Sequence, residues 1–188
     1  VARSGYSKQD GFEIYFKVHE DHFNITEMGE KLWDTLWDAG KNLNISPGCP
    51  NLIDRIEGGL MSYGNDFTRE NNPLECNLDK YCKSDNTHDF IGKTALSKIQ
   101  NHGIKQKMRG IIFNGSATKA TSQPLKVLTE DGVEIGQITS GIYSPRIEKN
   151  IGLSMILKDY WNLGQSVIVQ MLDGDKRNGT ITSLPFPD

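Results

Sequence analysis

A carboxylate and a phenol lie two residues apart near the start of the chain, at Glu13 and Tyr15. From Phe12 to Val18 apolar and polar residues alternate, which predicts a half-buried strand because strand side chains have a period of two. Glu13 and Tyr15 are therefore expected on one polar face, where they can form hydrogen bonds with a ligand. The alternative is an ordinary edge strand, since most Glu side chains stay exposed to water.

Other chemical motifs are absent from the sequence or incomplete. It contains no Walker loop, G-x-G-x-x-G, H-E-x-x-H or G-x-S-x-G. Gly92–Thr94 is similar to the end of a phosphate loop, but Thr87 stands where that loop needs a glycine, so a helix start is favoured. His19 and His22 have no third ligand nearby, which favours solvated loop residues over a metal site. We therefore expect no metal.

The composition indicates a globular protein. A net charge of -3 and a pI near 5.8 argue against nucleic-acid binding through a basic surface. No apolar run approaches the length of a membrane span and no signal peptide heads the sequence, so we expect a cytoplasmic protein without membrane contact. The three cysteines contain no C-x-x-C pair. Because Val1 is not Met, we expect the C-terminal part of something longer.

The first half of the chain reads as helices joined by polar loops. Apolar residues recur at helical spacing from 28 to 37, and Gly40 is expected to end that helix. A second helix is predicted within 51–62, and a short third one ends near Gly103. Arg55, in the second helix, more often forms a structural ion pair than a ligand contact at such a position.

The second half changes character near residue 105. Short β-prone runs are separated by turn signals such as Asp131-Gly132 and Asp173-Gly174, which predicts a compact antiparallel barrel or sandwich. The predicted strands are 109–113, 125–129, 133–139, 151–157, 167–171 and 180–184. An α+β segment is thus followed by an all-β module.

Several segments together resemble the aminomethyltransferase family, which includes the folate-dependent T-protein of glycine cleavage. Ser4–Ile14 is similar to the family's S-G-Y-T-G-E-D-G-x-E-I motif, and Asp54–Asp66 is similar to L-R-L-E-A-G-L-x-L-Y-G-x-D. Further matches follow in family order at 72–75, 89–93, 136–141, 144–150 and 184–186.

The resemblance implies a fold, a cofactor and a set of site residues. Residues 1–104 would be the second half of a folate-binding region, and 105–188 a small antiparallel β-barrel domain. Tetrahydrofolate would be the cofactor, with the Glu13 carboxylate accepting from its pterin. Tyr15, Tyr6 and Arg55 would be further cofactor-binding residues. The family's catalytic aspartate matches no position of this sequence.

Within the family, the chain is most similar to the tetrahydrofolate-dependent dimethylsulfoniopropionate demethylase branch, through Pro47–Ile53 and Ser62–Phe67. The T-protein carries an Arg-Asp pair where this chain has Asn51, which counts against glycine cleavage. We therefore expect methyl transfer from dimethylsulfoniopropionate to N5 of tetrahydrofolate, by an enzyme that forms a homodimer. The alternatives are an aminomethyltransferase, another folate-dependent N-demethylase, or a non-catalytic folate-binding fragment.

Overall fold

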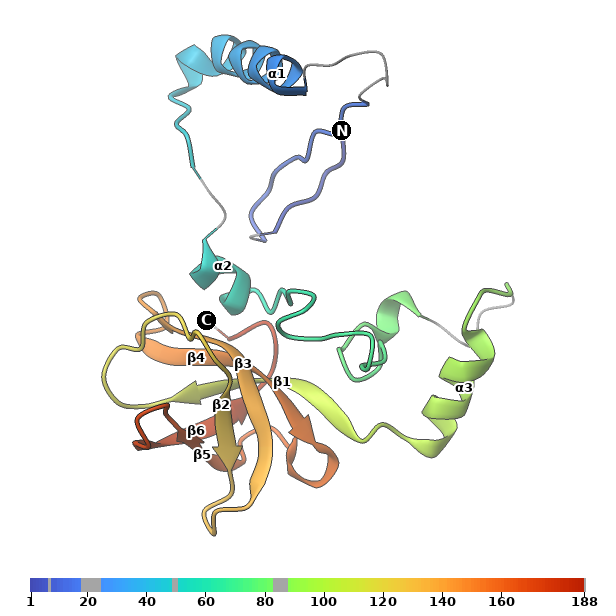
Figure 1. The fold of residues 1–188 in the computed structure, drawn as a ribbon, viewed down its shortest axis with the longest axis vertical. Helices are drawn as coiled ribbons and strands as arrows, with labels where there is room; N and C mark the ends of the chain where they lie inside the picture. Colours follow the sequence, from blue (N-terminus) through green and yellow to red (C-terminus); the bar gives the residue numbers. More distant parts are fainter. Residues whose placement is uncertain (7, 18–24, 49–50, 83–87, 188) are drawn as a thin grey trace. The chain divides into compact units, whose positions relative to one another are not determined.

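The computed structural model describes residues 1–6, 8–17, 25–48, 51–82 and 88–187. They divide into two compact units, Val1–Asn51 and Leu52–Asp188, each of which is described by itself. The second unit contains a six-stranded barrel, and the first contains an extended ribbon and one long helix (Figure 1).

The barrel confirms the all-β module expected from the turn signals and decides between barrel and sandwich. All its strand pairs are antiparallel and it closes in the order β1-β4-β3-β2-β5-β6, with β6 returning to β1 (Figure 1). Closure leaves no unpaired edge in the barrel. The strands are β1 Gln106–Phe113, β2 Leu125–Leu128, β3 Glu134–Ser144, β4 Lys149–Leu157, β5 Ser166–Gln170 and β6 Lys176–Thr182.

The barrel interior is filled by aliphatic side chains from all six strands. Alternate residues of a strand face inward, so β1 contributes Ile111 and Phe113 to the same cluster. Ile138 and Ile156 are fully buried in it. Burial of this apolar surface is the main favourable contribution to the stability of the unit.

A β-bulge interrupts the pairing of β3 with β4. Ile138 pairs with Ser154 and Ser140 pairs with Leu153, so Thr139 is an extra residue in β3. A bulge redirects the side chains beside it. The hydroxyls of Thr139 and Ser140 reach the loop that follows α2 in this way.

Helix α2 (Leu52–Glu57) belongs to the barrel unit. Its Ile56 packs with Met108, Ile151 and Phe186 in a second apolar cluster. Residues 52–67 are therefore held to the barrel, although the sequence predicted a division at 104/105. That division stays a prediction about domain organisation.

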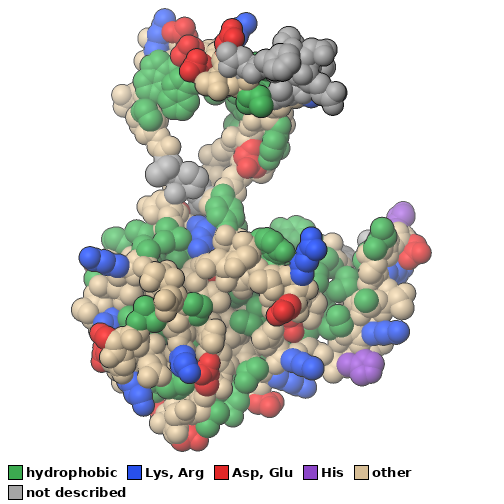
Figure 2. All heavy atoms as spheres, in the orientation of Figure 1, with side chains coloured by type: hydrophobic (Ala, Val, Ile, Leu, Met, Phe, Trp, Pro, Cys, Tyr) green, Lys and Arg blue, Asp and Glu red, His purple; other side chains and the backbone are tan. Residues whose placement is uncertain are grey.

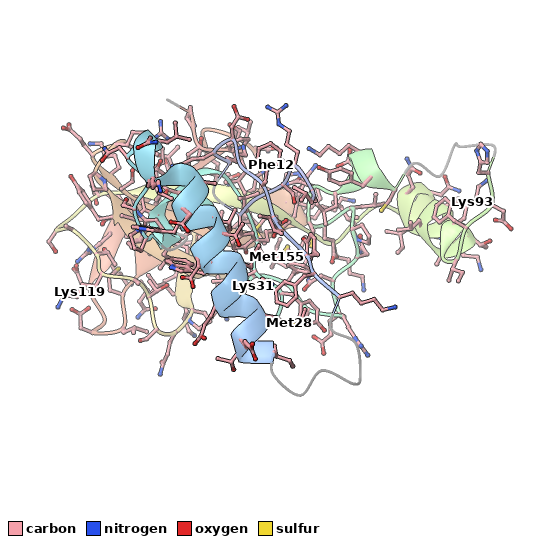
Figure 3. The ribbon with its side chains drawn as sticks, turned by 90° about the horizontal axis from the view of Figure 1, so that it is seen from above. Phe12, Met28, Lys31, Lys93, Lys119 and Met155 are labelled. Carbon is pink, nitrogen blue, oxygen red and sulfur yellow. The ribbon has the colours of Figure 1, made fainter. Side chains whose placement is uncertain are left out.

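The remaining short elements of the barrel unit connect its parts. They are α3 (Lys93–His102) and the 3-10 turns η2 (Asp79–Tyr81) and η3 (Lys158–Tyr160). The third predicted helix, ending near Gly103, is confirmed by α3. Lys93 lies at the beginning of that helix (Figure 3).

Helix α1 (Ile25–Gly40) confirms the longest predicted helix and ends where glycine was expected to end it. The 3-10 turn η1 (Lys41–Leu43) follows. A Cβ at position 40 would lie 2.4 Å from Cδ1 of Ile45, so any other residue there would require the Ile45 side chain to move. Figure 3 looks onto this helix, with Met28 and Lys31 labelled.

The apolar stripe of α1 remains open to solvent. Trp33 and Trp37 stack with ring centroids 6.0 Å apart, yet both are exposed, as is Leu36. The space-filling view shows hydrophobic side chains on the surface over α1 (Figure 2). Within the first unit, no described element covers these three side chains.

The strand predicted from Phe12 to Val18 is wrong as a regular strand. Its described part, up to Lys17, is extended but forms a single antiparallel bridge between Ala2 and Glu13. Phe12 is 69 % exposed, so the apolar face is not buried either. A segment with alternating apolar and polar residues forms a regular strand only when a neighbouring strand and a core are present. An isolated two-stranded ribbon is only marginally stable in water. Val18 lies outside the described residues.

Truncation of Ile156 tests the importance of the barrel interior. Ile156→Ala is expected to lower the free energy of unfolding of the barrel unit by about 2–5 kcal/mol, because it leaves a cavity in a packed core. Leu157→Ala, at the exposed neighbouring position, is expected to change it by less than about 0.5 kcal/mol. Chemical denaturation followed by near-UV circular dichroism measures both; equal losses would contradict the assignment of the core.

Candidate functional site

The predicted pair Glu13 and Tyr15 is brought together by the structure. The two side chains are hydrogen-bonded, and the Glu13 carboxylate raises the pKa of the Tyr15 phenol above its usual value. Both side chains are exposed, Tyr15 by 69 %. The prediction that they share a face is therefore confirmed, even though the ladder around them is missing.

A third side chain joins this pair. Ser4 donates a hydrogen bond to Oε2 of Glu13 from the other arm of the ribbon. The two arms are tied beside it by Ala2 and Glu13, whose backbone N–H groups each donate to the other's carbonyl at 2.9 Å. The Glu13 carboxylate is thus held at a fixed point of the ribbon by side chains on both arms.

Tyr6 lies in the same ribbon and is exposed. Its proposed role in cofactor binding stays a prediction, as do those of Glu13 and Tyr15. Asn51, the last residue of the first unit, is exposed as well.

Arg55 occupies a different environment from the other three predicted residues. It belongs to the barrel unit, where its guanidinium forms an ion pair of 2.8 Å with Asp66. The side chains are only 9 % and 0 % exposed. The structural ion pair considered from sequence is therefore formed, and the role of Arg55 in cofactor binding stays a prediction with less support than that of Glu13.

The Asp66 carboxylate is satisfied on both oxygens. Oδ2 accepts from Arg55 and, at 2.7 Å, from the backbone N–H of Ser62. Oδ1 accepts from the hydroxyls of Thr139 at 2.7 Å and Ser140 at 2.6 Å. Ser140 in turn accepts from Arg55 at 2.8 Å. A buried charge needs this degree of pairing because its desolvation is costly.

A second carboxylate in this unit also serves the structure. Glu57, at the end of α2, accepts from Nε of Arg146 at 2.7 Å and from the hydroxyl of Ser144. It therefore ties α2 to the turn between β3 and β4. Structural ion pairs of this kind are common at a helix exit.

The other chemical features of the sequence do not assemble into a site among the described residues. Helix α3 begins at Lys93 after Gly92 with φ of 95°, which confirms the helix-start interpretation of Gly92–Thr94. Cys76 is buried, and burial raises its pKa to about 11, so it is no thiolate nucleophile. His19 and His22 lie outside the described residues.

The metal-binding side chains and the best-formed cavity of the described residues do not point to the predicted residues. The described part of the chain holds no group of three His, Cys, Asp or Glu side chains able to bind a metal. A cavity of about 370 Å³ lies over β1, β5 and β6, lined by residues such as Ile112, Ser166 and Thr180. It contains none of the predicted site residues. No helix of the described residues is long and apolar enough to cross a membrane.

Sequence reasoning missed Ser4, Asp66 and Ser140. All three lie within segments that resemble family motifs, so the sequence marked their positions but did not indicate their roles. Ser4 is nine residues from Glu13, and Ser140 is 74 residues from Asp66. No periodicity relates residues at such separations.

Comparison with known families supports the resemblance drawn from the motifs. Residues 1–86 match the GCVT N-terminal domain, and residues 107–188 match the glycine cleavage T-protein C-terminal barrel domain. The chain belongs to the glycine cleavage T-protein family. The residues that match the family's C-terminal barrel domain form the closed barrel described above. The observed fold class is therefore that of the family.

Curated relatives include both branches considered from the sequence. The chain is 42 % identical over 174 residues to "Dimethylsulfoniopropionate demethylase DmdA" of Ruegeria pomeroyi, covering 93 % of this chain and 45 % of the relative. It is 34 % identical over 171 residues to an aminomethyltransferase of Caldanaerobacter subterraneus subsp. tengcongensis, covering 90 % and 42 %. The chain spans about half the length of the curated relatives it matches.

A solved structure shares the fold. The glycine cleavage system aminomethyltransferase T of Bartonella henselae aligns with a TM-score of 0.58 at 21 % identity, covering 72 % of this chain and 37 % of that one. At this identity the likeness concerns the fold alone.

Removal of Asp66 tests the buried ion pair. Asp66→Ala is expected to lower the free energy of unfolding of the barrel unit by roughly 3–5 kcal/mol, because the Arg55 charge is left buried without its partner. Asp10→Ala removes one partner of the exposed Arg3–Asp10 pair, whose side chains are 74 % and 96 % exposed, and should change it by less than about 0.5 kcal/mol.

Thermal and denaturant unfolding of the three proteins provides the measurement. If Asp66→Ala were as stable as the unsubstituted chain, the ion pair would not hold residues 52–67 to the barrel.

Proposed function

We propose that this protein is a tetrahydrofolate-dependent methyltransferase that moves a methyl group from dimethylsulfoniopropionate to N5 of tetrahydrofolate. Two facts support this substrate over a glycine-derived one. The identity to the dimethylsulfoniopropionate demethylase is 42 %, against 34 % and 35 % to two aminomethyltransferases. Asn51 also replaces the Arg-Asp pair typical of the T-protein.

The observation that carries the proposal is the exposed Glu13 carboxylate beside the Tyr15 ring. A reduced pterin presents a ring N–H and an exocyclic amine side by side. An ionised carboxylate accepts from both at once, with charge-assisted bonds that are stronger than neutral ones. The residues present therefore fit this cofactor.

A sulfonium substrate needs little chemical activation from the protein. Its positive sulfur already activates the methyl group, and bound tetrahydrofolate supplies N5 as the methyl acceptor. The side chains have to orient the substrate, which is how enzymes gain rate without acid, base or metal. The Tyr15 ring can hold the cation over its face, with an attraction of roughly 0.5–2 kcal/mol.

No residue of the 188 is assigned as catalytic acid or base. Arg55 and Asp66 saturate each other in the interior, and Glu57 is paired with Arg146. The proposed cytoplasmic location and the homodimer accompany the enzyme proposal; cell fractionation and analytical ultracentrifugation test them.

The second candidate function is that of an aminomethyltransferase or another folate-dependent N-demethylase. It is favoured by the aminomethyltransferases at 30–35 % identity. A third candidate is a folate-binding protein without turnover.

Substrate trials distinguish these functions. The product of the complete reading frame is incubated with tetrahydrofolate and dimethylsulfoniopropionate, and 5-methyltetrahydrofolate is quantified by mass spectrometry. We expect product. Absence of product together with turnover of an aminomethyl-lipoyl carrier would favour the second candidate instead.

Glu13→Gln tests the residue that carries the proposal. It is expected to lower the affinity for reduced folate roughly 10- to 100-fold, because a hydrogen bond to a charged group contributes about 1.5–3 kcal/mol. Glu70→Gln, at an exposed glutamate of the barrel unit, serves as the control and should bind normally. Isothermal titration calorimetry with tetrahydrofolate measures both variants; equal affinities would remove Glu13 from the site.

A further inference from the structure

Two hydroxyl groups on different arms of the ribbon meet at the Glu13 carboxylate. Ser4 donates to Oε2, and the Tyr15 phenol is hydrogen-bonded to the same carboxylate. Both hydroxyls are exposed, so neither is needed to satisfy a buried group. Their convergence calls for an explanation other than stability.

The ribbon places these groups by its register. Ala2 pairs with Glu13 in an antiparallel bridge, Ser4 lies two residues beyond Ala2, and Tyr15 lies two residues beyond Glu13. Alternation with a period of two puts all three side chains on one side of the ribbon. Ser4 therefore lies diagonally across the ribbon from Glu13, within reach of a long side chain, and Tyr15 lies two residues along the same arm as Glu13.

We propose that the hydroxyls of Ser4 and Tyr15 position the Glu13 carboxylate for its cofactor, so that Ser4 is a positioning residue of the folate site. A carboxylate has about four lone-pair sites. Two hydroxyl donors occupy two of them, and two remain for the paired N–H donors of a reduced pterin. This inference rests on the proposed function.

The hydroxyl and the ring of Tyr15 have different roles. The phenol oxygen is engaged with Glu13, whereas the ring is 69 % exposed. The hydroxyl therefore orients the carboxylate, and the ring face remains for the cofactor or the sulfonium group. Both neighbours affect the pKa of the phenol: Glu13 raises it, and Ser4 lowers it.

Binding of tetrahydrofolate to the product of the complete reading frame, measured by calorimetry, tests the role of Ser4. Ser4→Ala and Tyr15→Phe are each expected to weaken binding roughly 3- to 10-fold, less than Glu13→Gln, because each hydroxyl acts on the cofactor only by orienting Glu13. Ser4→Thr, which keeps the hydroxyl, should restore most of the affinity. Ser122→Ala and Tyr81→Phe remove exposed hydroxyls elsewhere and should bind like the unsubstituted chain.

Titration of the Tyr15 phenol provides a readout that needs no folate. The six tyrosines are labelled with ¹³C at Cζ, and the Tyr15 resonance is identified by its loss in Tyr15→Phe. Glu13→Gln should lower the Tyr15 pKa toward 10, since the carboxylate that raises it is gone. Ser4→Ala should raise this pKa further, since the opposing hydrogen bond is lost.

The outcomes separate this inference from the proposed function. Binding of tetrahydrofolate that Ser4→Ala leaves unchanged overturns the positioning role while the folate site stands. A Tyr15 pKa that does not respond to Glu13→Gln overturns the contact itself. If the unsubstituted chain does not bind tetrahydrofolate although the titration shows the contact, the folate role of Glu13 fails, and the positioning role that depends on it fails as well.

Discussion

The buried ion pair between Arg55 and Asp66 is the constraint on which the barrel unit depends. Neither charge can remain in the interior without the other, because desolvating a lone charge costs several kcal/mol. The loop after α2 must therefore stay on β3, where Ser140 completes the network. The bulge at Thr139 makes this possible by directing two neighbouring hydroxyls at one carboxylate oxygen.

The chain uses carboxylates in two opposite ways. Asp66 is buried and saturated by donors on both oxygens, which leaves no capacity for a ligand. Glu13 is exposed and oriented by two hydroxyls, and part of its acceptor capacity is left. Binding sites need the second arrangement, since a ligand must replace water at an oriented group. This contrast explains why Glu13 is the better candidate for cofactor binding. Arg55 also lies in a segment that resembles a family motif, but it is paired with the saturated Asp66.

The compact units of the structure and the family domains have different boundaries. The N-terminal family domain matches residues 1–86, whereas the barrel unit begins at Leu52. Residues 52–67 therefore match the N-terminal family domain in sequence but pack with the barrel unit. Ile56 and the Asp66 network make these contacts. In the first unit, by contrast, Phe12 and Trp33 remain exposed, so its apolar faces contribute little to stability within this chain.

Local pattern was enough to predict the strands of the barrel and the helix α1. The alternation and turn residues after 105 predicted six short strands, and helical spacing predicted α1 with its end at Gly40. The shared face of Glu13 and Tyr15 also followed from a spacing of two, because this depends only on extended backbone. Family motifs then supplied the fold and the site residues, which spacing alone does not.

Only the tertiary structure decided which of these residues are free to bind. Arg55 and Glu13 look alike in sequence, as charged residues in family motifs, but Arg55 meets Asp66 and Ser140 across long stretches of chain. The predicted strand at Phe12–Val18 failed for the same reason: a strand requires a neighbour, and its apolar face requires a core, neither of which is a local property. Sequence determined what each segment is suited for, and long-range packing determined whether that capacity was used.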